Sequence, residues 1–333
     1  MKKGILIGGI IAGLLLSACG GKVKAEEEAK APEEKLIVYT SHKPEIYEPI
    51  IKEFEERSGI WVQVVEGGTN ELLNQIAVNG EYGCADVMFG GGVDSLTAYS
   101  EYFEPYRTKQ YDKLENDYAS ETDAYTVFSE LPIVFVYNEK LVISAGTPRS
   151  FSELLNPMWK GRIAFANPEL SGSAYTALAT MIQALSETNT EEEVIRGFVA
   201  NLNGDISEGS GEAIDQVVSG NKAIGITLEE TALKRIDEGA KIGIAYPTDG
   251  TSLVPDGCAI LKNAPNRDNA ELFMEFIVGD DVQHLLEDKL SRRSVRTDIE
   301  SLNPVVKMDY DLEYAISTRE KVMSLWKSYT GGQ

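Results

Sequence analysis

The chain has 333 residues, of which 43% are hydrophobic, and its formal net charge at pH 7 is -22. This length is large for a single hydrophobic core and predicts two lobes. The strong negative charge argues against nucleic acid as a partner, and two histidines with three cysteines make a zinc or thiol enzyme improbable.

The N-terminus is typical of a targeting segment that is not part of the fold. Two lysines precede a short apolar run that is too short to span a membrane and that ends in LSAC at residues 16–19. This pattern is a lipobox, so we expect residues 1–18 to be a lipoprotein signal peptide and Cys19 to carry the lipid. The alternative is an ordinary signal peptide with a chance cysteine. Residues 19–35 hold no large apolar cluster and predict a flexible tether.

The first part of the folded chain alternates strands and helices. The predicted elements are strand 36–40, a helix that carries Ile46, Ile50, Ile51 and Phe54, strand 60–65, helix 71–80 and strand 85–90. Strand, helix and strand with short connections indicate right-handed crossovers and a parallel sheet.

The pattern changes near residue 126. The run TVFSELPIVFVYNEKL is typical of a strand that leaves one lobe for another. After it we expect strand 161–168, helices 174–185 and 191–202, strand 223–227, strand character in 241–265 and a helical segment at 269–286. The sequence therefore predicts an α/β protein with one lobe from 36–125 plus about 240–333 and the other from 126–239.

Glycines and hydroxyl residues stand where predicted strands end, which is where open parallel sheets bind ligands. The candidate binding residues at these ends are Ser41, His42, Thr69, Asn70, Gly91, Ser171, Gly172 and Ser173. Glycine lets backbone N–H groups approach a ligand, and a helix start supplies roughly half a positive charge without Lys or Arg. A cleft of this kind selects anions even in an acidic protein.

Two strand-to-helix turns carry this pattern most clearly, GGT at 67–69 and SGS at 171–173. Either turn alone is also explained as a plain helix N-cap. One such turn in each predicted lobe favours a clamp that closes on its ligand.

Several segments in order, together with the lipobox, resemble one family, the solute-binding proteins of ABC importers. The group in question spans iron(III), thiamine, hexose-phosphate and 2-aminoethylphosphonate binders. The segments cover about residues 36–325 and read LIVYTSHKPEIYEPIIKEFEERSGIWVQVVEGGTNELLNQI, ADVMFGGGVDSL, ANPELSGSAYTAL, GNKAIGITLEETALK and PDGCAILKNAPN.

The resemblance implies a two-lobed type II periplasmic-binding-protein fold that closes like a venus flytrap, with parallel-rich sheets and helices on both faces. It implies no catalysis and no cofactor. A small anionic ligand would be delivered to ABC permease and ATPase subunits. The protein would be a monomer, held to the membrane by its N-terminal lipid in the cell envelope and facing the periplasm or the exterior.

The ligand subgroup depends on particular residues. Iron(III) binders that resemble this chain carry adjacent tyrosines after the strand at 223–227, and here Glu229-Glu230 stand there. Hard Fe(III) accepts carboxylate, so this weakens the iron alternative without removing it. GGTNEL and SGSAYT are similar to the turns that hold phosphate in sugar-phosphate and phosphonate binders.

The other end of such a ligand would meet a second set of residues, Asp205, Ser207, Glu208 and Glu229. Carboxylates can bind sugar hydroxyls and an ammonium group equally well, so a hexose phosphate and 2-aminoethylphosphonate both remain candidate ligands. The plain alternative for Glu229 and Glu230 is a solvated helix start, where acidic residues favour the helix dipole.

Two other classes of protein stay open at the level of sequence. Ser41-His42 are adjacent, which is no triad geometry, and no GxSxG or metal motif occurs, so we expect neither an enzyme nor a metal site. A lipoprotein that senses a ligand for a two-component kinase would use the same fold.

Cys84 and Cys258 either pair in an oxidising compartment or remain free as small hydrophobes.

Overall fold

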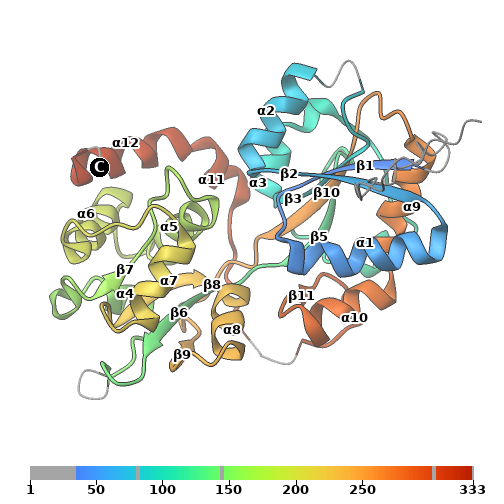
Figure 1. Cartoon of the computed structure of the whole chain (residues 1–333). Coiled ribbons are helices and arrows are strands. Elements are labelled where there is room, and N and C mark those ends of the chain that lie inside the picture. Colours follow the sequence, from blue (N-terminus) through green and yellow to red (C-terminus); the bar gives the residue numbers. More distant parts are fainter. Residues whose placement is uncertain (1–34, 80–82, 143–145, 302–304, 332–333) are drawn as a thin grey trace, which may run out of the picture. The chain divides into compact units, whose positions relative to one another are not determined.

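The computed structural model describes residues 35–79, 83–142, 146–301 and 305–331. The expected signal peptide, Cys19 and the tether, apart from Lys35, lie outside these residues. The larger sheet contains β1 (Lys35–Thr40), β2 (Trp61–Glu66), β3 (Val87–Gly92), β4 (Phe103–Glu104), β5 (Thr126–Glu130), β10 (Pro255–Leu261) and β11 (Arg293–Ser294). Its strand order is β11-β5-β10-β3-β1-β2, with β4 paired to β10 (Figure 1). We call the elements built on this sheet the first lobe.

The smaller sheet contains β6 (Ile133–Asn138), β7 (Ile163–Ala164), β8 (Ile224–Leu228) and β9 (Ile242–Ala245), in the order β7-β8-β6-β9. The elements around it form the second lobe. The chain passes from β5 in the first sheet to β6 in the second within a few residues, as the run after residue 126 predicted. The expected two-lobed α/β organisation is confirmed.

The start of the first lobe follows the predicted strand–helix alternation. Helix α1 (Pro44–Ser58) has Pro44 in its first turn and ends at Gly59, whose φ of 73° suits glycine. Helix α2 (Thr69–Asn79) connects β2 to β3. Strands β1–β2 and β1–β3 pair in parallel, so the residues that follow them meet at one edge of the sheet.

The expectation of parallel-rich sheets was wrong, because both sheets are mixed. Strand β7 pairs in parallel with β8, but β6 runs antiparallel to β8 and β9, and β10 runs antiparallel to β3 and β5. The passages of the chain between the two lobes explain the antiparallel pairing. A strand that returns from the second lobe enters the first sheet at the edge where β1 and β3 end, so it runs in the opposite direction.

The second lobe carries α4 (Phe151–Leu154), α5 (Gly172–Ala184), α6 (Glu191–Leu202), α7 (Ser210–Val218) and α8 (Glu229–Asp237). The C-terminal helix α12 (Arg319–Thr330) packs against α6, and buried Trp326 lies 5.9 Å from the Phe165 ring. Together with β9, this helix lies with the second lobe, although we expected about 240–333 in the first. An apolar stripe on a helix indicates burial but does not say which lobe it covers.

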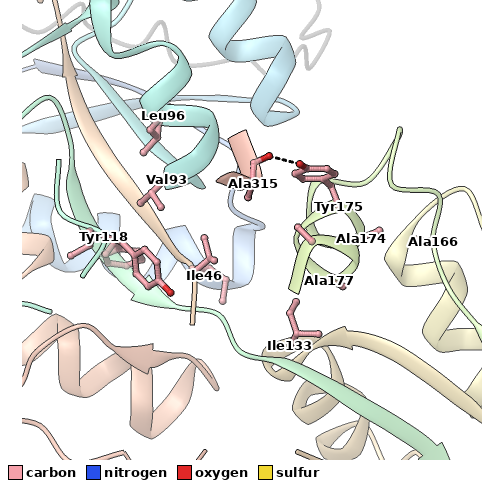
Figure 2. Close-up of a cluster of buried hydrophobic side chains, with 14 of the residues drawn as sticks. Ile46, Val93, Leu96, Tyr118, Ile133, Ala166, Ala174, Tyr175, Ala177 and Ala315 are labelled. Carbon is pink, nitrogen blue, oxygen red and sulfur yellow. Dashed lines mark hydrogen bonds between the residues drawn. The ribbon is translucent and has the colours of Figure 1, made fainter. Parts of the chain in front are cut away.

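A short helix links the C-terminal segment to both lobes. Helix α11 (Leu312–Ser317) contacts α3 (Val93–Ala98) of the first lobe. On its other side, the Tyr175 hydroxyl of α5 donates a hydrogen bond to the Ala315 carbonyl oxygen (Figure 2). Among the helices that the structure describes, none is long and apolar enough to cross a membrane.

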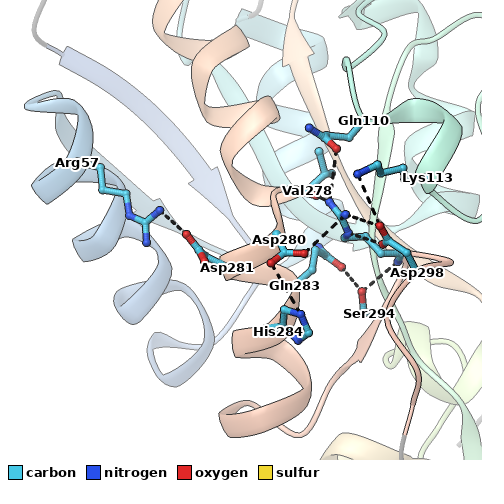
Figure 3. A network of polar contacts seen from close by, with 11 residues as sticks. Arg57, Gln110, Lys113, Val278, Asp280, Asp281, Gln283, His284, Ser294 and Asp298 are labelled. Atoms are coloured by element: carbon cyan, nitrogen blue, oxygen red, sulfur yellow. Dashed lines mark hydrogen bonds and ion pairs between the residues drawn. The ribbon is translucent and has the colours of Figure 1, made fainter.

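The helical segment predicted at 269–286 consists of two helices, α9 (Arg267–Ile277) and α10 (Asp280–Lys289), separated at Gly279. The chain after α10 is held by a polar network (Figure 3). The buried Gln283 side chain accepts hydrogen bonds from the Ser294 hydroxyl at 2.8 Å and the Val295 N–H at 3.1 Å. This fixes the position of the two arginines that precede Ser294.

Both cysteines in the described part of the chain are free thiols. Cys258 is fully buried on β10, and burial raises the pKa of its thiol well above the usual value. Cys84 is partly buried. Of the two expectations, the structure supports free cysteines.

Candidate functional site

A central cavity of about 470 Å³ is lined by residues of both lobes. Seven of the predicted binding residues line it: Ser41, His42, Thr69, Asn70, Gly91, Gly172 and Ser173. The first four lie after β1 and β2 of the first lobe, Gly91 lies near the end of β3, and the last two begin α5 of the second lobe. The arrangement brings the GGT and SGS turns to one cavity.

The GGT turn leaves the Thr69 hydroxyl without a partner among the described residues, although Thr69 is the first residue of α2. The turn itself is closed by the backbone, because Gly67 N–H donates to the Thr40 carbonyl and Leu72 N–H to that of Gly68. Gly91, with φ of 90°, leaves room beside it, since a Cβ there would lie 2.7 Å from Thr69 Cγ2. Thr69 is therefore free to donate into the cavity.

The SGS turn divides its serines between two tasks. Ser171 is the N-cap of α5, because its hydroxyl accepts a hydrogen bond from Ala174 N–H at 3.3 Å, and it does not line the cavity. Ser173 does line it. The hydroxyls of Ser171, Ser173 and Ser210 lie 2.8–3.1 Å from one another. The plain capping interpretation applies to Ser171, and Ser173 remains the candidate donor.

His42 is a neutral, buried side chain at the cavity wall. Burial lowers its pKa to about 3, although Asp256 opposes this, and its ring packs at 4.6 Å from that of Phe89. Nε2 is buried without a hydrogen-bond partner in the described structure, and it lies 3.6 Å from Asp256 Oδ2. Gly90 keeps the space beside it open, because a Cβ there would come within 3.0 Å of Nε2.

Arg292 lines the same cavity and was missed by the sequence analysis. Its Nη1 donates to Asp256 at 2.5 Å and to the Ser129 hydroxyl at 2.9 Å, and its Nη2 pairs with Glu230 at 2.6 Å. Burial lowers the pKa of Arg292, but the charges of Glu230 and Asp256 outweigh this effect and raise it. Nε is buried with no partner in the described residues.

The charged residues around the cavity are balanced in sign, although the protein as a whole is acidic. Three cationic residues line it, Lys43, Arg292 and Arg319, against three carboxylates, Glu71, Asp94 and Asp256. The N-termini of α1, α2 and α5 also reach the lining, and each adds partial positive charge. The cavity thus differs in electrostatic character from the protein as a whole.

Three residues expected at the other end of the ligand lie outside the cavity lining and support the second lobe instead. Asp205 pairs with buried Lys222 at 2.7 Å. The Ser207 hydroxyl, in a residue 2% exposed, accepts from the Gln216 amide at 3.0 Å. Glu208 lies just before α7. The segment is tied to the second lobe by a parallel bridge between Ser207 and Ala166, which lies just after β7.

Glu229 also lies outside the central cavity. It is 3% exposed and accepts two hydrogen bonds from Arg293, at 2.6 and 2.8 Å, and a third from the Tyr246 hydroxyl. Glu230 pairs with Arg292. Neither glutamate is a solvated helix start. In the part of the chain that the structure describes, no group of three or more His, Cys, Asp or Glu is placed to hold a metal ion.

Comparisons with known proteins agree with this architecture. Residues 86–313 match a family model described as "Bacterial extracellular solute-binding protein". Iron uptake protein A1 of Synechocystis sp. is 25% identical over 297 residues, which are 83% of this chain and 80% of that protein. A putative 2-aminoethylphosphonate-binding periplasmic protein of Salmonella typhimurium is 23% identical over 257 residues, 74% of this chain and 73% of that protein.

Among solved structures, the periplasmic binding protein AfuA from Actinobacillus pleuropneumoniae, with exogenous fructose-6-phosphate bound, has a TM-score of 0.77 to this chain. The match covers 89% of this chain and 98% of that one at 22% identity. This likeness confirms the expected two-lobed type II fold.

Proposed function

We propose that this chain, which belongs to the family of bacterial extracellular solute-binding proteins, captures a small phosphorylated or phosphonate solute and delivers it to an ABC importer. The observation that carries the proposal is that donors without protein partners converge on one cavity. They are the Thr69 hydroxyl, Nε2 of His42 and Nε of Arg292. The Ser173 hydroxyl of the facing lobe lines the same cavity and contacts the Ser171 and Ser210 hydroxyls.

A phosphoryl group matches this donor set. It offers several charged oxygens, and each hydrogen bond to a charged group contributes roughly 1.5–3 kcal/mol. Helix N-termini favour the same charge, and α2 and α5 both begin at the cavity. His42 adds a ring N–H donor, and because its pKa is about 3 its charge does not change near neutral pH. The structure of AfuA, with fructose-6-phosphate bound, supports the same ligand class.

Iron(III) is the second candidate, favoured by the similarity to Iron uptake protein A1 over 83% of this chain. The donor chemistry argues for the phosphorylated solute. Glu229 and Glu230 are occupied by Arg293 and Arg292, which compete with a metal for the same oxygens. No tyrosine is among the described residues that line the central cavity.

Calorimetry on the purified protein tests the proposal. We expect fructose 6-phosphate or 2-aminoethylphosphonate to bind, and glucose, which lacks the phosphoryl group, to give no heat of binding. Ferric citrate is titrated in parallel. Tight binding of iron together with no binding of either phosphorus compound would replace the proposal with the iron function.

The membrane attachment is part of the same proposal. A lipid on Cys19 would hold the protein in the envelope beside its permease and ATPase partners. Cys19→Ala should release the protein from the membrane fraction, whereas Cys84→Ala, which leaves the lipobox intact, should not. A Cys19→Ala protein that still fractionates firmly with membranes would contradict lipidation at this residue.

A further inference from the structure

A side cavity of about 180 Å³ adjoins the central cavity, and no predicted function accounts for it. Four residues line both spaces: Asn70, Asp94, Ser95 and Arg319. Asn70 follows Thr69 directly in α2. A ligand with its phosphoryl group at Thr69 therefore has the side cavity as adjoining space for the rest of its structure.

One wall of the side cavity is formed by Tyr175 and Arg319, which contact each other. Tyr175 is 2% exposed, and its hydroxyl donates to the Ala315 carbonyl (Figure 2). The Arg319 guanidinium carbon lies 4.1 Å from the centroid of the Tyr175 ring, which orients the guanidinium by a cation–π contact. Arg319 forms no hydrogen bond to any residue in the described ranges, so its N–H donors are oriented and available.

The charges of the side cavity cancel. Arg319 Nη1 lies 3.6 Å from Asp94 Oδ2, too far for a hydrogen bond but close enough for the two charges to compensate. A ligand ammonium that approached Asp94 would meet the Arg319 charge, and a second ligand anion would meet Asp94. A hydroxyl does better, because it donates to the carboxylate and accepts from the guanidinium at once.

The remaining lining matches a hydroxylated tail. The side chains of Asn70 and Ser95 add donors and acceptors that have no partner among the described residues. Ala98, Tyr99 and Ile316 supply apolar surface for the carbon skeleton. A volume of about 180 Å³ exceeds what a two-carbon chain occupies and would leave water beside one.

We infer that the side cavity is a second subsite that takes the uncharged, hydroxylated tail of the ligand. The preferred solute is then a sugar phosphate or another polyol phosphate rather than an aminoalkylphosphonate. Arg319 and Asp94 determine this specificity. The inference rests on the proposed function, because it takes the phosphoryl group to lie near Thr69.

Filling the side cavity tests the inference without altering the phosphoryl seat. Ala98 is exposed at the end of α3, so Ala98→Leu should fold normally while it occupies the subsite. We expect fructose 6-phosphate to bind about tenfold to a hundredfold more weakly to this variant, because its tail loses its hydrogen bonds. Affinities for 2-aminoethylphosphonate and inorganic phosphate should stay as in the unmodified protein. Ala200→Leu, on the exposed face of α6, is the matched control.

Arg319→Gln is the second variant, since it keeps a planar polar group but removes the charge. It should weaken fructose 6-phosphate by about tenfold and inorganic phosphate much less, with exposed Arg196→Gln as its control. Equal weakening of all probes, no weakening of any, or preferred binding of 2-aminoethylphosphonate by the unmodified protein would overturn the subsite. Failure of every phosphorus probe to bind the unmodified protein would overturn the proposed function, and the subsite with it.

Discussion

Thr69 and Thr190 both stand at the start of a helix but use their hydroxyls differently. The Thr190 hydroxyl accepts from Glu193 N–H in a capping box, whereas the Thr69 hydroxyl bonds to nothing in the described structure. Thr69→Val keeps the shape but removes a donor to a charged ligand oxygen. We expect ligand affinity to fall about tenfold to a hundredfold with an unchanged melting temperature, measured by calorimetry and a thermal melt.

The Thr190→Val variant is the control with the opposite expectation. Loss of the cap should lower the stability of the protein by about 1 kcal/mol and leave ligand affinity alone. If Thr69→Val instead lowers the melting temperature and spares affinity, then Thr69 is a helix cap and the phosphoryl seat lies elsewhere.

Single residues also mark the limit of sequence reasoning. Ser41 and Thr69 were predictable because they lie shortly after β1 and β2, and strand ends in parallel pairs meet at one edge. Arg292 was not, because its place in the cavity depends on Asp256 and on the fold of the intervening chain. A guanidinium in a cavity has no local sequence pattern comparable to a glycine-rich turn.

At the level of elements, the first turn of α8 is joined to the first lobe by two ion pairs, Glu229–Arg293 and Glu230–Arg292. Glu229→Ala would leave the buried Arg293 charge without its partner. We expect a loss of roughly 3–5 kcal/mol in the free energy of unfolding, measured by urea titration, with little change in which solutes bind.

Asp215→Ala is the matched control for the buried pair, because Asp215 is 60% exposed where it pairs with Arg235. An exposed pair contributes about 0–1 kcal/mol, so this variant should unfold almost as the unmodified protein does. Unchanged stability of Glu229→Ala together with lost binding would restore Glu229 as a ligand contact.

The bounds of a helix can be predicted from its own sequence, but the direction of a strand or the lobe that a helix covers cannot. Helix α6 was predicted at its observed bounds, Glu191–Leu202, because its apolar period and capping residues are local. The direction of β10 was not predicted, because it depends on the edge at which the chain re-enters the first sheet. The same holds for α12, whose apolar stripe fits either lobe until the packing of Trp326 on Phe165 is known.

At the level of the whole molecule, Glu130 ends β5 just before the chain crosses to the second lobe. Burial raises its pKa to about 7, Lys307 and Arg293 oppose this, and Glu115 and Glu287 add to it. The ordinary pKa of a glutamate carboxyl, which we take for the unfolded chain, is about 4.5. Between pH 4.5 and pH 7 the Glu130 carboxyl is therefore protonated in the folded state and ionised in the unfolded state. The stability that Glu130 contributes in acid consequently falls across this range and is lost as the pH rises through 7.

Glu130→Gln removes that titration. The variant should be more stable than the unmodified protein at pH 8, by on the order of 2 kcal/mol, and should gain little at pH 4. Urea unfolding at the two pH values measures the difference. An equal gain at both would mean that the amide acts by packing and that Glu130 does not carry a raised pKa.

Closure of the two lobes is the last expectation, and it follows from where the donors lie. Thr69 belongs to the first lobe and Ser173 to the second, and both line one cavity, so a ligand that contacts both joins the two lobes. Glu45 and Lys234 also pair across the lobes, but their side chains are 47% and 48% exposed. Such a pair contributes little, and ligand contacts should decide the equilibrium.

Hydrogen bonds to the ligand can supply enough free energy to shift the two lobes from an open to a closed arrangement. Moving a population from 1:99 to 99:1 requires about 5.5 kcal/mol of difference in binding free energy, and two or three hydrogen bonds to a charged group supply about that amount. Small-angle scattering should therefore give a smaller radius of gyration with saturating fructose 6-phosphate and no change with glucose. An unchanged curve at saturation would mean that the lobes hold one arrangement, and the SGS turn would then meet its ligand without any movement toward the GGT turn.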